Sequence, residues 1–142
     1  MSFIIPAAVA IVVIVVVAVV IINKRRNPDH TIASGGAIED LTNDKLSEII
    51  NARDPNTYLI DVRSTREYKS GTIPTSIHIP YQTIADNLPT DDKSARIIVY
   101  CQAGGRSDTA KNTLEQLGFK NVTNYGGIVD WDGELEYPEQ EK

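Results

Sequence analysis

Residues 97–107 read IIVYCQAGGRS, and this stretch decides the fold class. It opens with a continuous apolar run, which predicts a β-strand that is buried on both faces and ends near Cys101. Two glycines follow in a short loop. Ser107–Phe119 then places apolar side chains at helical spacing and contains Gly118, which predicts a helix that closes at a C-terminal glycine. A strand, a tight loop and a helix in this order form one unit of an α/β sheet.

The same alternation continues on both sides of this unit, which predicts an α/β domain with a largely parallel sheet. A helix is predicted over Thr42–Asp54, with Thr42 or Asn43 as its N-cap. Tyr81–Pro89 predicts a helical turn or two. The other candidate strands are short apolar runs bounded by turn residues; they are Ala37–Leu41, Thr57–Arg63, Ser76–Pro80 and Asn121–Tyr125.

Phe3–Ile22 is an uncharged apolar run of 20 residues, about the length of a helix that spans a bilayer. Lipid leaves a helix as the only workable form for an isolated span, and Pro6 falls in its first turn, where a missing N–H costs little. The alternative is a buried core helix, which a run of this length without a polar face disfavours. We therefore expect one transmembrane helix over residues 3–22.

Basic residues follow this run directly, at Lys24, Arg25 and Arg26, whereas no Lys or Arg precedes it. The positive-inside bias predicts a single-pass protein of the cell membrane, with its N-terminus outside and its folded domain in the cytoplasm. A cleaved signal peptide would carry basic residues before the run and a small-residue cleavage site after it. Residues 23–36 are expected to hold the basic flank and a turn-rich linker.

The chain after position 26 is acidic. It holds all 19 Asp and Glu residues but only 11 of the 14 Lys and Arg residues, for a net charge of −8. This balance argues against nucleic acid as a partner and against binding flat on anionic lipid. An anionic ligand would need local donors. We expect the domain to span residues 37–134 and an acidic tail to follow over 135–142.

Cys101 is the single cysteine of the chain, and it stands at the carboxyl end of a strand, where open α/β sheets bind ligands. Gly104 and Gly105 let the loop turn several N–H groups inward, and the following helix adds the positive end of its dipole. Arg106 adds a permanently charged planar fork. Such an anion cradle lowers the pKa of a thiol, and the thiolate is the nucleophile. The alternative is a small buried hydrophobe, which the glycines and the arginine disfavour.

Other polar residues carry weaker signals. Asp61 and Arg63 follow an apolar strand and are expected to fix the next turn through buried hydrogen bonds or an ion pair; the alternative is that Arg63 helps to bind an anion. Glu67 is expected to cap a helix or to pair locally. His30 and His78 are too isolated in the sequence to predict a metal site.

Three segments, in order, resemble motifs of the single-domain rhodanese family of sulfurtransferases. Leu59–Pro80 is similar to its Asp-Val-Arg motif and the Gly-His-Ile-Pro-Gly-Ala turn beyond it, Val99–Ser107 to its active-site loop, and Tyr125–Trp131 to its C-terminal Gly-Gly motif. The resemblance implies a central parallel five-stranded sheet with helices on both faces. This chain departs from the family at Thr72 and Thr75, which replace the histidine and the second glycine of the turn.

The resemblance also implies a reaction at Cys101. Thiosulfate or another sulfane-sulfur donor would bind through the loop amides and Arg106, and Cys101 would become a persulfide. Cyanide or a thiol would then accept the sulfur, with no metal or other cofactor. The residues expected to bind the donor follow Cys101 in the chain; they are Gln102, Ala103, Gly104, Gly105, Arg106 and Ser107.

Loop length bears on the competing functions. Four residues lie between Cys101 and Arg106, one fewer than in the phosphatases and arsenate reductases of this fold, which favours sulfur over a tetrahedral oxyanion. A second hypothesis is a membrane-tethered persulfide carrier or regulatory interaction module with weak turnover. A phosphatase or arsenate reductase is the third. The sequence points to no particular protein partner.

Overall fold

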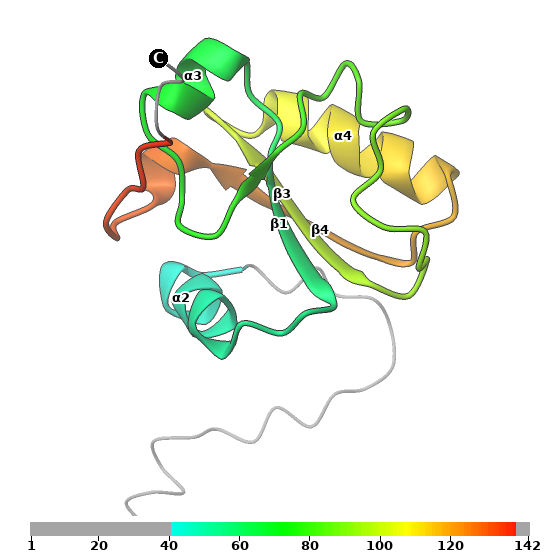
Figure 1. The fold of residues 1–142 in the computed structure, drawn as a ribbon, viewed down its shortest axis with the longest axis horizontal. Coiled ribbons are helices and arrows are strands. Elements are labelled where there is room, and N and C mark those ends of the chain that lie inside the picture. The colour runs from blue at the N-terminus through cyan, green and yellow to red at the C-terminus, as the bar shows by residue number, and fades with distance from the viewer. Residues whose placement is uncertain (1–40, 139–142) are drawn as a thin grey trace, which may run out of the picture. The chain divides into compact units, whose positions relative to one another are not determined.

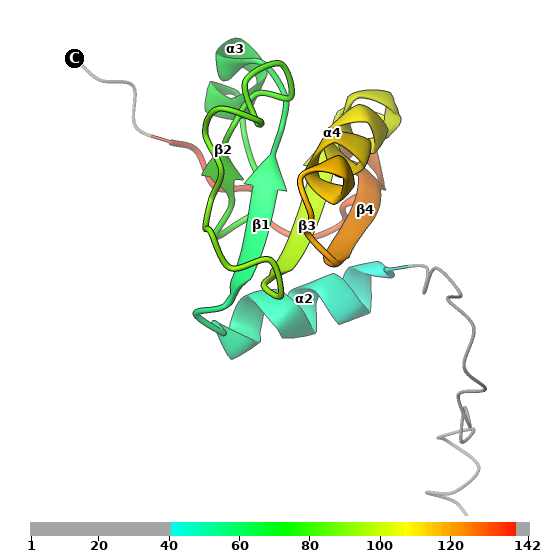
Figure 2. The same cartoon turned by 90° about the vertical axis from the view of Figure 1, so that its right-hand side faces the viewer.

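A parallel β-sheet forms the centre of residues 41–138, the part of the chain that this computed structural model describes (Figure 1). Among these residues the sheet has four strands in the order β2-β1-β3-β4, and each neighbouring pair is parallel (Figure 2). The elements in chain order are α2 Asn43–Ala52, β1 Thr57–Asp61, α3 Thr65–Lys69, β2 Ile77–His78, β3 Arg96–Cys101, α4 Gly105–Gln116, β4 Asn121–Gly127 and the 3-10 turn η1 Ile128–Asp130.

The four strands predicted after residue 56 are confirmed as β1 to β4. The fifth candidate strand, Ala37–Leu41, lies outside the described residues except for Leu41, which has no regular structure. The predicted transmembrane helix at 3–22 and the linker at 23–36 also lie outside them. Within residues 41–138, none of the helices has the length and apolar character needed to cross a membrane.

Tyr81–Pro89 matches the predicted helical turn or two. The segment forms consecutive hydrogen-bonded turns instead of a regular helix, with the N–H groups of Asp86 and Asn87 both donating to the carbonyl of Thr83. It still covers the sheet, because Ile84 is buried in the core.

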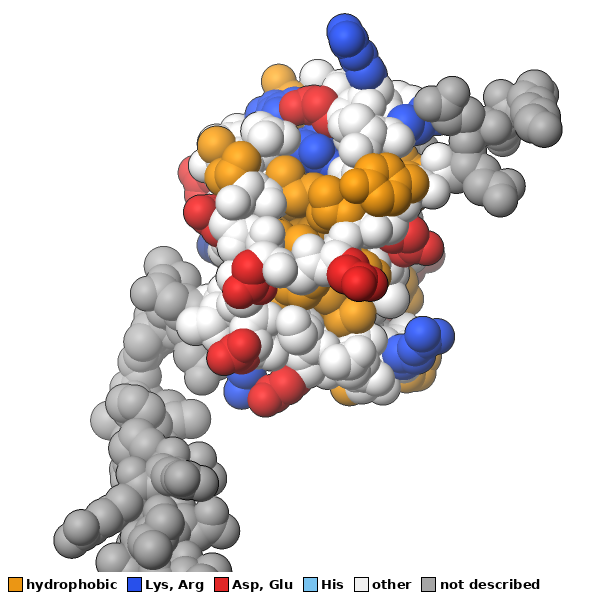
Figure 3. All heavy atoms as spheres, turned by 90° about the vertical axis from the view of Figure 1, so that its left-hand side faces the viewer, with side chains coloured by type: hydrophobic (Ala, Val, Ile, Leu, Met, Phe, Trp, Pro, Cys, Tyr) orange, Lys and Arg blue, Asp and Glu red, His pale blue; other side chains and the backbone are white. Residues whose placement is uncertain are grey.

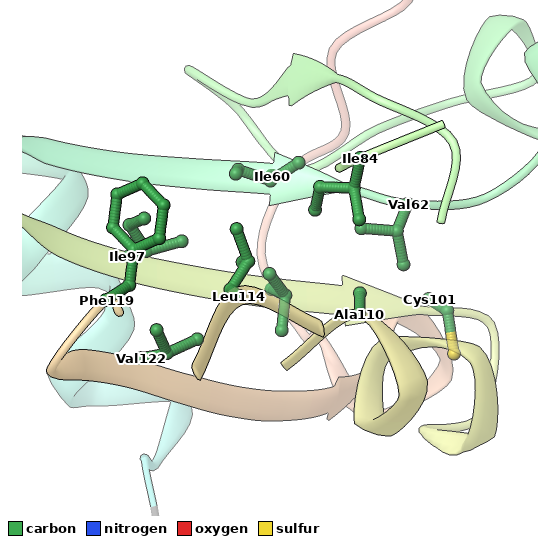
Figure 4. Close-up of a cluster of buried hydrophobic side chains, with 10 residues drawn as sticks. Ile60, Val62, Ile84, Ile97, Cys101, Ala110, Leu114, Phe119 and Val122 are labelled. Carbon is green, nitrogen blue, oxygen red and sulfur yellow. The ribbon is translucent and has the colours of Figure 1, made fainter. Parts of the chain in front are cut away.

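One face of the sheet packs against α4 (Figure 4). Ile60 of β1 and Ile97 of β3 point into this layer, where Ala110 and Leu114 of α4 meet them, and all four side chains are fully buried. Cys101 lies at the end of the same layer, beside the start of α4. The helix therefore fixes the position of the cysteine through the apolar contacts that hold it to the sheet.

The opposite face packs against α2. Leu59, Ile98 and Tyr100 alternate along β1 and β3 with the residues of the first face, and Leu46 of α2 is buried against them. All of Ile97–Cys101 is buried, as predicted for a strand enclosed on both sides. The predicted placement of helices on both faces is confirmed.

The capping signals in the sequence at the start of α2 and after the end of α4 are present in the structure. Thr42 caps α2 with its hydroxyl, which accepts a backbone N–H from the first turn. Gly118 follows α4 at a φ of +95°, and the N–H of Phe119 donates to the carbonyl of Leu114. This is the Schellman arrangement that a glycine after the last helical turn predicts.

The chain reverses after α3 in a turn that the C-terminal segment braces. Thr72 and Glu136 form an antiparallel bridge with two N–H···O bonds of 2.8 Å. Leu135 lies so close to Gly71 that a Cβ there would be 3.0 Å from its side chain. The expected tail over 135–142 is corrected here, because residues 135–137 pack against the domain.

Thr75 occupies this turn with a φ of +68°, where the family turn has glycine. A β-branched residue in the left-handed region is strained by about 1–2 kcal/mol, whereas glycine is not. We expect Thr75→Gly to raise the free energy of unfolding by about 1 kcal/mol after the added entropy of the unfolded chain is subtracted. Urea unfolding measures the change. Thr123→Gly, at an extended position in β4, should lower stability, and a loss in both variants would contradict the strain.

Candidate active site

Cys101 ends β3, and α4 begins at Gly105, two residues earlier than the helix start that the sequence predicts near Ser107. Only Gln102, Ala103 and Gly104 separate the strand from the helix. Gly104 makes so short a connection possible because its φ is +103°, a left-handed angle that residues with a Cβ rarely adopt. The sulfur points toward the first turn of α4 (Figure 4).

Hydrogen-bond donors surround the sulfur. The N–H of Gly104 donates to Sγ at 3.0 Å, and the hydroxyl of Ser107 lies 3.4 Å from it. Burial raises the pKa of the Cys101 thiol, but hydrogen bonds from Ser107 and from the amides of Ala103 and Gly104 outweigh burial, so the pKa lies below its usual value. The site therefore favours a thiolate.

Access to this sulfur is narrow, since the Cys101 residue is 1% exposed. On its other side Cys101 packs into the buried apolar layer between the sheet and α4. A pocket of about 260 Å³ does exist beside α2 and the start of β1, but none of residues 101–107 lines it. The candidate site is thus the loop itself and not that pocket.

Ser107 is fully buried, and its single hydroxyl proton faces three acceptors. These are Sγ of Cys101, the carbonyl of Gly104 at 2.9 Å and the carbonyl of Gly126 at 3.2 Å. A charged acceptor makes the stronger hydrogen bond, so ionisation of the thiol draws the proton toward the sulfur. Ser107 can therefore respond to the charge of Cys101 without moving its backbone.

The end of β4 supports the loop from the side. A Cβ on Gly127 would lie 2.4 Å from the carbonyl oxygen of Gln102 and 2.8 Å from Cα of Ala103, so only glycine lets the strand approach so closely. Gly126 has a φ of +103° just before it, where the register of β4 shifts against β3. At this glycine pair the structure therefore combines a bulge with a backbone contact to the loop.

Arg106 does not stand free. Its two terminal nitrogens donate to the two carboxylate oxygens of Glu67 at 2.8 and 2.7 Å. Hydrogen bonds and charge from Glu67 raise the pKa of Arg106, and the charge of Cys101 acts in the same direction. The expected helix cap at Glu67 is present at the start of α3, but its ion pair is not local: it reaches Arg106, 39 residues away, and joins α3 to the cysteine loop.

Asp61 and Arg63 form a buried ion pair, with Nη2 of Arg63 2.7 Å from the carboxylate. The same guanidinium donates to the carbonyl of Gly71 at 2.6 Å and reaches the side-chain oxygen of Gln102 at 3.5 Å. The pair therefore holds the turn after β1 and touches one side of the loop. This geometry fits the expectation that Asp61 and Arg63 fix the turn after their strand through a buried ion pair.

Tyr100 is a supporting residue that the sequence did not indicate. Its buried hydroxyl bonds to the hydroxyls of Thr72 at 2.6 Å and Ser76 at 2.7 Å, accepts the N–H of Ile73 and donates to Asp61. Burial and the charge of Asp61 raise the pKa of Tyr100 far above its usual value, which keeps the phenol neutral. The one hint in the sequence was Thr72, which replaces the histidine of the family turn and whose hydroxyl bonds to Tyr100.

His78 has an ordinary structural role. Its Nε2 lies 2.8 Å from the carbonyl of Arg63, and its ring stacks on Tyr68 with the centroids 4.5 Å apart. No group of three or more potential metal ligands occurs within the described part of the chain.

We expect Ser107→Ala to raise the pKa of Cys101, because the variant loses a donor to the thiolate. Alkylation by iodoacetamide follows the thiolate, so the rate at neutral pH should fall several-fold and the rise in rate should move to higher pH. Thr109→Ala is the matched control, since that hydroxyl bonds to the carbonyl of Gly105 and not to sulfur. Identical alkylation profiles for Ser107→Ala and the unaltered chain would contradict the assignment.

A parallel α/β sheet with a thiolate-stabilising loop at the carboxyl end of an interior strand defines a class of proteins that act through a cysteine nucleophile. The family model described as a rhodanese-like domain matches residues 42–134. The chain belongs to the rhodanese-like domain family, and the resemblance seen in its motifs is confirmed.

Relatives of this chain carry sulfurtransferase names. YtwF of Bacillus subtilis, which is named provisionally as a sulfurtransferase, is 37% identical over 97 residues that cover 68% of this chain and 93% of YtwF. The thiosulfate:glutathione sulfurtransferase of Saccharomyces cerevisiae is 30% identical, covering 66% of this chain and 78% of its own length. The crystal structure of a rhodanese-like domain protein from Staphylococcus aureus matches with a TM-score of 0.60 at 33% identity, over 69% of this chain and 96% of that one.

Proposed function

We propose that this protein transfers sulfane sulfur from thiosulfate or a similar donor to a thiol or cyanide through a persulfide on Cys101. The observation that carries the proposal is the set of donors aimed at Sγ, with the Gly104 amide at 3.0 Å and the Ser107 hydroxyl at 3.4 Å. These donors favour the thiolate, and the thiolate is the form that attacks sulfur.

The reaction has two displacements at sulfur. In the first, the Cys101 thiolate attacks the outer sulfur of thiosulfate; a new S–S bond forms, the old one breaks, and sulfite leaves with its electron pair. In the second, an acceptor thiolate or cyanide attacks the terminal sulfur of the persulfide, and the Cys101 thiolate leaves. Sulfur moves as a neutral atom, so neither step needs an external oxidant or reductant.

The loop would stabilise charge at both stages. The amides that face Sγ can donate equally to a terminal persulfide sulfur, and the positive end of α4 favours an anion there. Arg106 keeps three of its five N–H groups free of the carboxylate of Glu67, and these can bind donor oxygens. Gln102, Ala103 and Gly105 complete the binding loop.

A persulfide carrier with slow turnover is the second candidate, and the 1% exposure of Cys101 favours it. A recessed sulfur can hold a persulfide safely yet exchange it slowly. The two functions share the first displacement and differ in the rate of the second.

Mass spectrometry tests the first displacement. The protein treated with thiosulfate should gain the mass of one sulfur on Cys101, and Cys101→Ser should gain none. With cyanide as acceptor, the unaltered chain should release thiocyanate over many turnovers and Cys101→Ser should release none above background. A sulfur adduct with about one turnover would favour the carrier, whereas no adduct, or equal turnover in Cys101→Ser, would refute both candidates.

We also propose that residues 3–22 anchor the domain in the cell membrane, with the domain on the cytoplasmic side. The support is the uncharged run of 20 residues and the basic cluster after it. The full chain should stay with membranes through alkaline carbonate washing, and a chain beginning at residue 27 should be released. A fusion reporter after Lys142 that works only when exported would contradict the orientation.

A further inference from the structure

The guanidinium of Arg106 binds the carboxylate of Glu67 through two parallel hydrogen bonds. Both oxygens of Glu67 accept a hydrogen bond, and the two side chains are about equally exposed, at 32% and 33%. The residues come from α3 and from the first turn of α4, 39 positions apart in the chain. The contact therefore places a carboxylate against Arg106, in the first turn of α4 after the cysteine loop.

The carboxylate of Glu67 is held in place from its own helix as well. One oxygen accepts the backbone N–H of Ser64 at 3.1 Å and its hydroxyl at 2.6 Å, and the Ser64 hydroxyl accepts the N–H of Glu67 in return. This capping box opens α3. Hydrogen bonds from Arg106 and Ser64 hold the pKa of Glu67 far below its usual value despite its partial burial, so it is charged at any physiological pH.

Each of the two arginines that reach the loop forms an ion pair with a carboxylate. Arg106 is paired with Glu67, and Arg63, which touches Gln102, is paired with Asp61. With the thiolate of Cys101 counted, this group of charges is negative by one. Acidic side chains are also scattered over the face shown in Figure 3, and the chain after position 26 is acidic as a whole. The loop offers many N–H donors but little net positive charge.

We propose that Glu67 is a positioning residue that sets the charge selectivity of this site, so that donors with one negative charge or none at the reacting end are preferred over dianions such as thiosulfate. The inference rests on the proposed function, since it concerns the donor of that reaction. It follows from the geometry because Glu67 leaves the hydrogen-bonding edges of Arg106 in place while cancelling its charge. A dianion meets the uncompensated thiolate with twice the repulsion of a monoanion.

Two donors with the same reacting S–S bond separate charge from chemistry. Thiosulfate is a dianion, and methanethiosulfonate is a monoanion in which a methyl group replaces one charged oxygen. Each gives its outer sulfur to Cys101, and the leaving group is sulfite for the first and methanesulfinate for the second. Steady-state kinetics with cyanide as acceptor give kcat and KM for both.

Glu67→Gln is the decisive variant, because Gln fills the same place in a capping box and still accepts one N–H from Arg106. We expect kcat/KM to rise about tenfold for thiosulfate and about threefold for methanethiosulfonate, since the dianion feels the lost charge twice. The gain should lie in KM and should shrink as salt is added. Far-ultraviolet circular dichroism checks that the variant is folded.

Two controls isolate the charge next to Arg106. Ser64→Ala weakens the capping box but keeps the carboxylate of Glu67. The ratio of kcat/KM for thiosulfate to kcat/KM for methanethiosulfonate should therefore not change. Glu115→Gln removes another ion-paired carboxylate, near the far end of α4, and should also leave the ratio unchanged. If Glu67 acted only by holding α3 in shape, Ser64→Ala would change the ratio of kcat/KM for the two donors in the same way as Glu67→Gln.

The outcomes separate this inference from the function beneath it. Turnover with an unchanged donor ratio in Glu67→Gln, or an equal change in Glu115→Gln, overturns the charge selectivity and leaves the sulfur transfer standing. No turnover and no sulfur adduct on the unaltered chain with either donor overturns the sulfur transfer and this inference together. The charge selectivity is supported if the ratio of kcat/KM for thiosulfate to that for methanethiosulfonate rises about threefold in Glu67→Gln and in neither control.

Discussion

The hydrogen bond from the Gly104 amide to Sγ of Cys101 is the contact on which the rest of the site depends. It requires the chain to leave β3 and enter α4 within three residues, and only a left-handed angle at Gly104 allows that turn. The same turn brings the start of α4, its positive dipole and the Ser107 hydroxyl to the sulfur. Strand, loop and helix thus act together to aim hydrogen-bond donors at the sulfur, which favours the thiolate form of Cys101.

Contacts on both sides of the loop hold its backbone in place. Gly127 allows the backbone of β4 to touch the loop, and the Asp61–Arg63 pair holds the turn on its other side. The Tyr100 hydroxyl ties that pair to the turn at Thr72. These polar groups are buried, and no buried side-chain nitrogen or oxygen within residues 41–138 lacks a hydrogen-bond partner. A fully satisfied network of this kind is rigid, and a rigid frame keeps the donors aimed at sulfur.

The sequence predicts the local features of this molecule well. Strand β3, helix α4 and the loop at Cys101 follow from an apolar run, a helical period and two glycines, because such signals lie within a few neighbouring residues. Pairings between distant segments are not visible in that way. The partner of Arg106 is 39 residues away, and the hydroxyls that meet Tyr100 come from a turn more than 20 residues earlier. The bracing of Thr72 by Glu136 escaped prediction for the same reason.

A crystal structure of the chain after treatment with a sulfane-sulfur donor would show whether the loop holds a persulfide. We expect one extra sulfur bonded to Sγ of Cys101, lying inside the loop within hydrogen-bond distance of at least two backbone amides. An unmodified thiol, or an added sulfur turned away from the loop amides, would refute a persulfide held by this loop.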